Sequence, residues 1–265
     1  LNNFGIINID SEFNPGFTNS GLLNNTGMIK INHPDAISNN SGSITGSGTY
    51  IQTGGTSNNT GNISLARIEI QSGIFNQQSG SLTATSIANN GTFNFTGGTL
   101  SAESLSNTGL FLGTGTIAAE TFTNAGTLAP GNSPGMLTIE GNYIQTTRGV
   151  LAIELASATS YDILNVTGEV SLAGILKIIL YDDYEPAYGT YFDFLTAELL
   201  NGEFDSIAGA AGYRWSVAYL DLIGLDGKID TARLTANEVP IPAALWLFVS
   251  GMLGIIGLRN MWKIN

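Results

Sequence analysis

In the first half of the chain, isolated apolar residues alternate with polar ones inside a short motif that repeats. The clearest copies span Gly80–Phe93, Gly98–Phe111 and Gly115–Leu128, at offsets of 18 and 17 residues. Weaker copies begin near Gly42 and Gly61. A fixed period of this size is typical of a solenoid, in which each unit stacks on the next.

The spacing within each copy predicts strands. Leu82, Ala84 and Ile87 are separated by polar residues, and the next copy has Leu100 and Ala102 at the same positions. Apolar residues at nearly every second position indicate a strand with one buried face. Strands of only three to five residues need neighbours about 4.8 Å away to pair their backbone groups. We therefore predict an all-β fold, a right-handed parallel β-helix; the alternative is a disordered linker rich in Gly, Ser, Thr and Asn.

An Asn-x-Gly triplet follows the predicted strand in each of the three clear copies, at Asn89, Asn107 and Asn124. Asparagine and glycine both tolerate the positive φ that a tight corner requires. We therefore expect these triplets to form the corners between strands.

The chain ends in a long apolar run. No charged residue occurs from Ile241 to Leu258. A helix of about 18 residues is roughly 27 Å long, close to the ~30 Å of a bilayer core. The run is apolar on all sides, which favours a transmembrane helix over the alternative of a buried helix in a soluble domain. Arg259 and Lys263 follow and should hold the extreme C-terminus in the cytoplasm, which places the rest of the chain outside the inner membrane.

The order of these parts resembles the PEP-CTERM sorting signal, in which a short Pro-x-Pro motif precedes a transmembrane helix and a basic tail. Ile241 stands where that family has its Glu. The resemblance implies processing by exosortase, a membrane-embedded cysteine transpeptidase of Gram-negative bacteria that make exopolysaccharide. The two prolines should keep the motif outside the helix. The residues concerned are Val239, Pro240, Ile241 and Pro242 in the sorting motif, Ala243, Leu245, Trp246, Phe248, Gly251, Gly254, Gly257 and Leu258 in the membrane anchor, and Arg259 and Lys263 in the basic tail.

A second resemblance covers residues 126–204. Pro130-Gly-x-Ser-Pro-Gly135 is followed by Leu137-x-Ile-x-Gly-Asn-Tyr143 and Tyr161-Asp-x-Leu-x-Val-x-Gly168. This series is similar to the C-terminal part of the passenger β-helix of autotransporters. Residues 213–224 and 229–236 indicate final strands that close the helix, with 235–238 as a spacer to the membrane. An autotransporter would continue into its own outer-membrane barrel, whereas here the sorting tail follows.

The composition and net charge exclude some classes of function. The 265 residues include no cysteine and carry a net charge of −12. A chain without cysteine has neither disulfides nor a thiolate nucleophile. The negative charge argues against nucleic acid, whose phosphates need clustered Lys and Arg. Because the chain starts at Leu1 while its tail requires export, we expect a fragment or a mature chain whose signal peptide has been removed.

Few residues are candidates for chemistry. His33, the only histidine, lies in a loop-like stretch without a nucleophile elbow, and we find no phosphate loop or Cys/His cluster. We expect no catalytic residue, metal or cofactor. Glu103 and Glu120 occupy the same repeat position and should stack one coil apart. Such a pair can hold Ca²⁺ or act on sugar, but we favour a solubilising face. Glu69 and Arg67 are the other charges of this region, and we interpret the acidic loop 181–186 as a solvated turn.

We expect three parts: β-helix repeats (1–145), terminal coils with a β cap (146–236), and the sorting signal (237–265). The preferred hypothesis is an exported, non-enzymatic protein, anchored in the inner membrane before processing and then located at the surface or in the matrix of a Gram-negative bacterium. Its expected partners are the exosortase-type transpeptidase, the membrane, and exopolysaccharide or like chains, with no nucleic acid. The alternatives are a polysaccharide lyase or hydrolase, with its acids in a missing N-terminal part or at Asp182, Asp183 and Glu185, and an adhesin.

Overall fold

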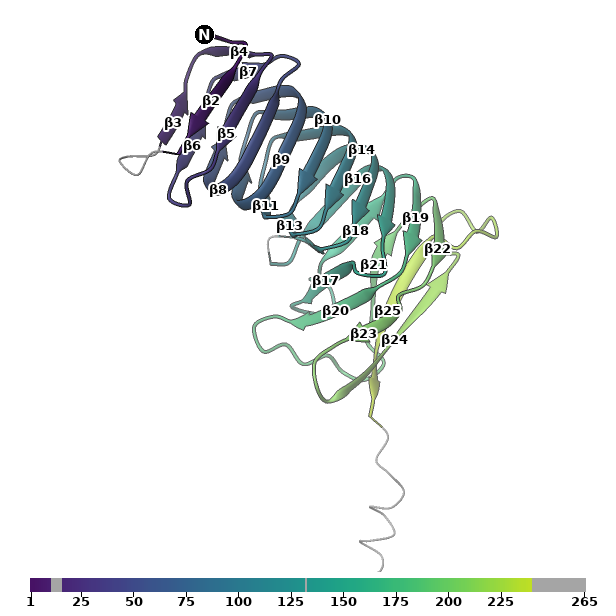
Figure 1. The fold of residues 1–265 in the computed structure, drawn as a ribbon. Helices are drawn as coiled ribbons and strands as arrows, with labels where there is room; N and C mark the ends of the chain where they lie inside the picture. Colours follow the sequence, from purple (N-terminus) through teal and green to yellow (C-terminus); the bar gives the residue numbers. More distant parts are fainter. Residues whose placement is uncertain (11–15, 132, 240–265) are drawn as a thin grey trace, which may run out of the picture.

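Figure 1 shows the computed structural model of the chain, which describes residues 1–10, 16–131 and 133–239. These residues form an all-β parallel solenoid of about 8 turns, whose coils lie side by side along one axis. No helix occurs among them. The predicted all-β solenoid is therefore confirmed, and the alternative of a disordered linker is wrong for the repeats. The predicted membrane helix and basic tail lie outside the described residues.

Strands follow one another with short connections along the whole described chain. The bounds are β1 (Asn2–Asn3), β2 (Ile6–Ile9), β3 (Gly16–Asn19), β4 (Leu22–Asn25), β5 (Met28–Ile31), β6 (Ile37–Asn40), β7 (Ser43–Thr45), β8 (Thr49–Asn59), β9 (Asn62–Gln77), β10 (Ser81–Asn89), β11 (Thr92–Phe95), β12 (Thr99–Asn107), β13 (Leu110–Gly113), β14 (Gly115–Asn124), β15 (Thr127–Pro130), β16 (Met136–Gln145), β17 (Val150–Leu155), β18 (Ile163–Val166), β19 (Glu169–Leu172), β20 (Ile175–Leu180), β21 (Tyr191–Thr196), β22 (Leu199–Gly202), β23 (Ser206–Ala208), β24 (Tyr213–Leu220) and β25 (Thr231–Glu238).

The register of the parallel strands reproduces the repeat alignment. Leu82 of β10 lies between Ile63 of β9 and Leu100 of β12, and Leu100 is followed by Ile117 of β14. The weaker copies fit the same register, since Ile44 of β7 pairs with Ile63. Repeat spacing in the sequence therefore predicted which residues stack.

Strand length was predicted less well. β10, β12 and β14 contain 9, 9 and 10 residues rather than three to five. Each of these strands bends at an exposed corner, where Thr85 and Glu103 are skipped in the backbone pairing between β10 and β12. The apolar phase also slips at this corner, since Ala84 and Ile87 are three positions apart and both buried. Two short segments are thus joined into one strand.

The core is a set of columns that run through successive coils. Leu82, Leu100 and Ile117 are at most 1% exposed, and burial of each contributes on the order of 1.5–3 kcal/mol. Next to them, Phe93 stacks on Phe111 with 4.8 Å between ring centroids. Because no coil can bury its apolar residues alone, each coil is stabilised by its neighbours.

The structure corrects the reason given for the Asn-x-Gly triplets. Asn89, Asn107 and Asn124 are fully buried, and none has a positive φ. Instead, Asn89 Nδ2 donates to Asn107 Oδ1 (2.7 Å), and Asn107 Nδ2 donates to Asn124 Oδ1 (2.8 Å). Gly109 is required by close approach, because a Cβ there would lie 2.1 Å from the carbonyl oxygen of Gly91. The triplets therefore form a buried amide ladder, and the expectation that they adopt positive φ was wrong.

The last strands leave the parallel pattern. β25 lies between β21 and β24 and is antiparallel to both. The pairing of β24 with β25 extends from Leu220↔Thr231 to Tyr213↔Glu238. Residues 235–238 are thus part of a strand, and the expectation that they form a spacer was wrong, because their backbone groups are paired.

Candidate functional site

The predicted sorting motif begins where the described chain ends. Val239 follows β25 directly and is 48% exposed. Pro240, Ile241 and Pro242 lie outside the described residues, as do the anchor positions and the basic tail. Among residues 1–10, 16–131 and 133–239, there is no helix of the length and apolarity needed to cross a bilayer.

The histidine region contains a local turn. His33 Nδ1 accepts a hydrogen bond from the backbone N–H of Asp35 (3.1 Å). This contact uses one ring nitrogen to stabilise the loop between β5 and β6. The structure thus gives His33 a role in the turn.

The predicted carboxylate pair is adjacent. Ala102 pairs with Ala119 and Ser104 with Thr121, so Glu103 and Glu120 occupy the same corner of neighbouring coils. Together with Glu140 they line a shallow hollow of about 670 Å³. The prediction that these two acids stack is confirmed. In the part of the chain that the structure describes, no group of three or more His, Cys, Asp and Glu side chains could hold a metal ion.

The other charges that the sequence singled out lie apart from this pair. Arg67 forms an ion pair with Glu69, which also accepts a hydrogen bond from Gln71 Nε2 (3.0 Å). Asp182 and Asp183 form an exposed turn after β20, with φ of 52° and 55°. The acids considered for catalysis therefore do not converge on Glu103 and Glu120.

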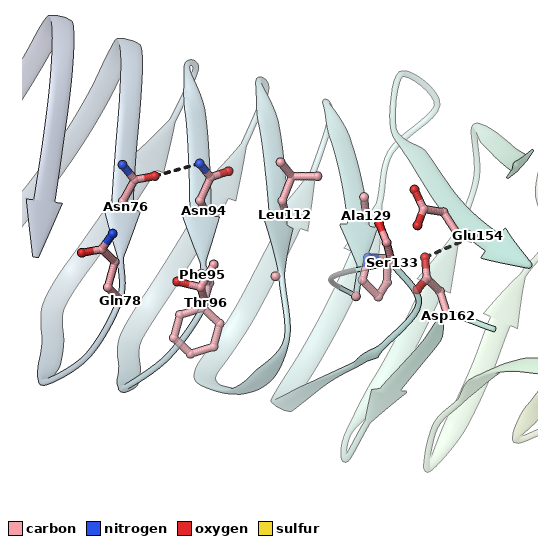
Figure 2. A pocket seen from close by; sticks show the side chains of 13 residues that line it. Asn76, Gln78, Asn94, Phe95, Thr96, Leu112, Ala129, Ser133, Glu154 and Asp162 are labelled. Atoms are coloured by element: carbon pink, nitrogen blue, oxygen red, sulfur yellow. Dashed lines mark hydrogen bonds between the residues drawn. The ribbon is translucent and has the colours of Figure 1, made fainter. Parts of the chain in front are cut away.

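A deeper cavity of about 390 Å³, which was not predicted from the sequence, lies between Asn76 and Asp162. Figure 2 shows the side chains that line it, from successive coils. The polar groups are the amides of Asn76, Gln78 and Asn94, the hydroxyls of Thr96 and Ser133, and the carboxylates of Glu154 and Asp162. Phe95, Leu112 and Pro130 add apolar surface.

Asp162 connects two of the three motifs on which the autotransporter resemblance rests. Its Oδ1 accepts the backbone N–H of Gly135 (2.8 Å), and its Oδ2 accepts the backbone N–H of Glu154 (2.9 Å). Gly131 leaves room for this carboxylate, since a Cβ there would lie 2.1 Å from Asp162 Oδ1. The Asp162 side chain thus links the Tyr-Asp segment to the Pro-Gly-x-Ser-Pro-Gly segment by a hydrogen bond.

The environment of Asp162 favours its neutral form. The residue is only 1% exposed, and burial raises the pKa of its carboxyl group to about 7. The backbone N–H groups of Glu154 and Gly135 act in the opposite direction, because they stabilise the carboxylate. With both oxygens already hydrogen-bonded, Asp162 stabilises the wall of the cavity.

A row of amides leads into this cavity along the outside of the coils. Asn58 Nδ2 donates to Asn39 Oδ1 (2.9 Å), Asn76 Nδ2 to Asn58 Oδ1 (2.8 Å), and Asn94 Nδ2 to Asn76 Oδ1 (2.8 Å). Figure 2 shows the last of these bonds, with Leu112 at the next position of the row. The Leu112 side chain cannot donate, and Asn94 Oδ1 has no hydrogen-bond partner among the residues that the structure describes. Because each amide is oriented by its neighbours, the row offers ordered donors and acceptors.

Comparison with known proteins assigns no family. No family model matches the chain, and no curated protein matches it.

Proposed function

We propose that the chain is an exported, non-enzymatic structural or adhesive protein of the surface or extracellular matrix of a Gram-negative bacterium. In this proposal, the solenoid is a right-handed rod whose last strands form a cap, and its polar faces bind exopolysaccharide or neighbouring rods. The segment from Val239 to Lys263 anchors the chain in the inner membrane until exosortase processes it. Right-handed connections between parallel strands are strongly preferred, which supports the handedness.

The observation that carries this proposal is the row of oriented amides formed by Asn39, Asn58, Asn76 and Asn94. Neighbouring coils place equivalent groups about 4.8 Å apart. A polymer with hydroxyl groups at regular intervals can hydrogen-bond to such a row at many positions, so that weak contacts add up. A rod with repeated polar groups suits a structural or adhesive role.

One observation favours the alternative of a glycan hydrolase or lyase: Glu154 and Asp162 line the same cavity, and the pKa of Asp162 is raised. A general acid must, however, be free to donate to the glycosidic oxygen. Both Asp162 oxygens accept backbone hydrogen bonds instead. We therefore prefer the non-enzymatic function.

The sorting part of the proposal is tested by expressing the full chain and a form without residues 239–265 in an exosortase-positive host and in a matched null host. We expect the full chain to lose its tail and reach the surface only where the enzyme is present. Cell fractionation and intact-mass measurement of the C-terminus provide the readouts. An uncleaved tail in both hosts would leave a plain membrane anchor and refute processing by exosortase.

A further inference from the structure

Several tyrosines line a groove that includes the first residue of β21. Figure 1 shows β21 and β25 at the C-terminal end of the solenoid. Tyr188 is 59% exposed and Tyr191 is 54% exposed. Both line a shallow groove of about 500 Å³, together with Tyr161 and Thr190. Single exposed apolar residues need no explanation, but several aromatic rings around one groove are typical of a binding site.

The ring of Tyr191 is held in place from one side. The Arg233 guanidinium carbon lies 4.0 Å from the centroid of this ring. Arg233 is itself fixed by Asp193, through hydrogen bonds from Nε (2.6 Å) and Nη2 (2.8 Å). The guanidinium covers one face of the ring, and the ring's exposure leaves the other face for a ligand. A fixed ring loses little conformational entropy on binding.

Tyr188 is also fixed, through its backbone. The N–H of Gly189 donates to the carbonyl oxygen of Ala236 (2.8 Å), and the N–H of Ala236 donates to that of Thr190 (3.0 Å). The Tyr188 ring lies edge-on to Tyr213, with 5.8 Å between the centroids. The loop that carries Tyr188 is therefore attached to β25, and the two groove tyrosines have a defined separation.

The charges near the groove argue against an anionic ligand. Among the described residues that border the groove, Arg233 is the cation in contact with Tyr191, and Asp193 already neutralises it. Glu185 lies near Tyr213 and adds negative charge. Among the described residues that line the groove there is no Lys or Arg to attract an anionic polymer. A neutral sugar ring, in contrast, can pack its C–H face on an aromatic ring and direct its hydroxyls to water.

We propose that this groove binds a segment of a neutral glycan, whose sugar rings stack on the exposed faces of Tyr188 and Tyr191. The inference rests on the proposed function and deepens it, because it names a glycan subsite distinct from the amide row. The groove is open and shallow, which suits a stretch of polymer better than an enclosed small molecule.

The test uses the full chain in micelles of a detergent without a sugar head group. Binding of neutral gluco-, galacto- and manno-hexasaccharides and of an oligogalacturonate of equal length is measured by calorimetry. We expect at least one neutral hexasaccharide to bind and the oligogalacturonate not to bind. Tyr188→Ala and Tyr191→Ala should each weaken binding roughly tenfold, because each removes one stacking face.

Two variants provide controls. Tyr188→Phe keeps the ring and should retain the affinity. Tyr181→Ala removes a tyrosine that is 42% exposed but does not line the groove, and it should leave binding unchanged.

The outcomes separate this inference from the proposed function. Glycan binding that is unchanged in both groove variants would refute the groove and leave the amide row as the binding surface. Failure of every hexasaccharide and of exopolysaccharide to bind would contradict both. Loss of self-association in the variants, with glycan binding intact, would identify the groove as a contact between copies of the chain and refute the glycan subsite.

Discussion

The buried amide ladder makes a quantitative prediction at Asn107. Its side chain accepts a hydrogen bond from Asn89 (2.7 Å) and donates to Asn124 (2.8 Å), to the carbonyl oxygen of Thr127 (3.0 Å) and to that of Gly109 (3.3 Å). Asn107→Ala removes all four bonds from a site that is 0% exposed. At about 0.5–1.5 kcal/mol for each of the four bonds, the free energy of unfolding should fall by roughly 2–6 kcal/mol.

Equilibrium unfolding in urea measures this loss, with circular dichroism and intrinsic fluorescence as independent probes. Ser106→Ala is the matched control, because Ser106 is the preceding residue of the same strand, is exposed, and its hydroxyl donates one long hydrogen bond, to the carbonyl oxygen of Ile87 (3.5 Å). Ser106→Ala should change the free energy of unfolding by less than about 0.5 kcal/mol. Equal effects of the two substitutions would show that the ladder does not stabilise the coils and would refute this reasoning.

Three further predictions follow from burial and hydrogen bonding. Leu100→Asp should open a coil and abolish two-state unfolding, whereas Ser101→Asp should be tolerated, because Leu100 is 1% exposed and Ser101 is partly exposed. Proteolysis within the repeats distinguishes the two variants, and equal resistance to the protease would contradict the assignment of Leu100 to the core. The pKa of Asp162 is raised to about 7 from an unfolded value near 4, so the folded state binds more protons and the stability that Asp162 contributes at low pH is lost as the pH rises through about 7. Asp162→Asn should remove this difference between the free energies of unfolding measured at pH 5 and pH 8. If the variant keeps the difference, another group causes it. Asn89 pairs with Ile70 in the register, and its Oδ1 has no hydrogen-bond partner within the described part of the chain. Ile70→Asn should place a donor beside this oxygen and should destabilise the fold less than Ile70→Ala. The reverse order of the urea midpoints would contradict the ladder geometry.

The apolar period predicted the fold well because burial and position coincide in a solenoid. Leu82 and Leu100 stack as expected, since both the phase within a copy and the offset between copies were visible in the sequence. The corner at Glu103 was less visible. A bend inside a strand changes the apolar phase by only one position, so the sequence alone gave strands that were too short.

The amide ladder shows where sequence reasoning stopped. An Asn two residues before a Gly is compatible with a positive-φ corner and with a buried side chain that bonds to the next coil. Only the stacking of the coils distinguishes the positive-φ corner from the buried side chain. Asn107 has the buried side chain, which donates to Asn124 of the next coil. In the same way, Asp162 and Gly135 are 27 residues apart, beyond the 17- and 18-residue offsets of the clear repeats, so their contact was not predicted.

The proposed rod binds glycan without cutting it. The direct measurement incubates the full chain with the exopolysaccharide of an exosortase-positive host, sediments the protein, and determines both the amount of bound glycan and its length distribution. We expect glycan to sediment with the chain and to keep its original length. Shortened glycan would indicate an enzyme, and glycan that stays in the supernatant would contradict binding.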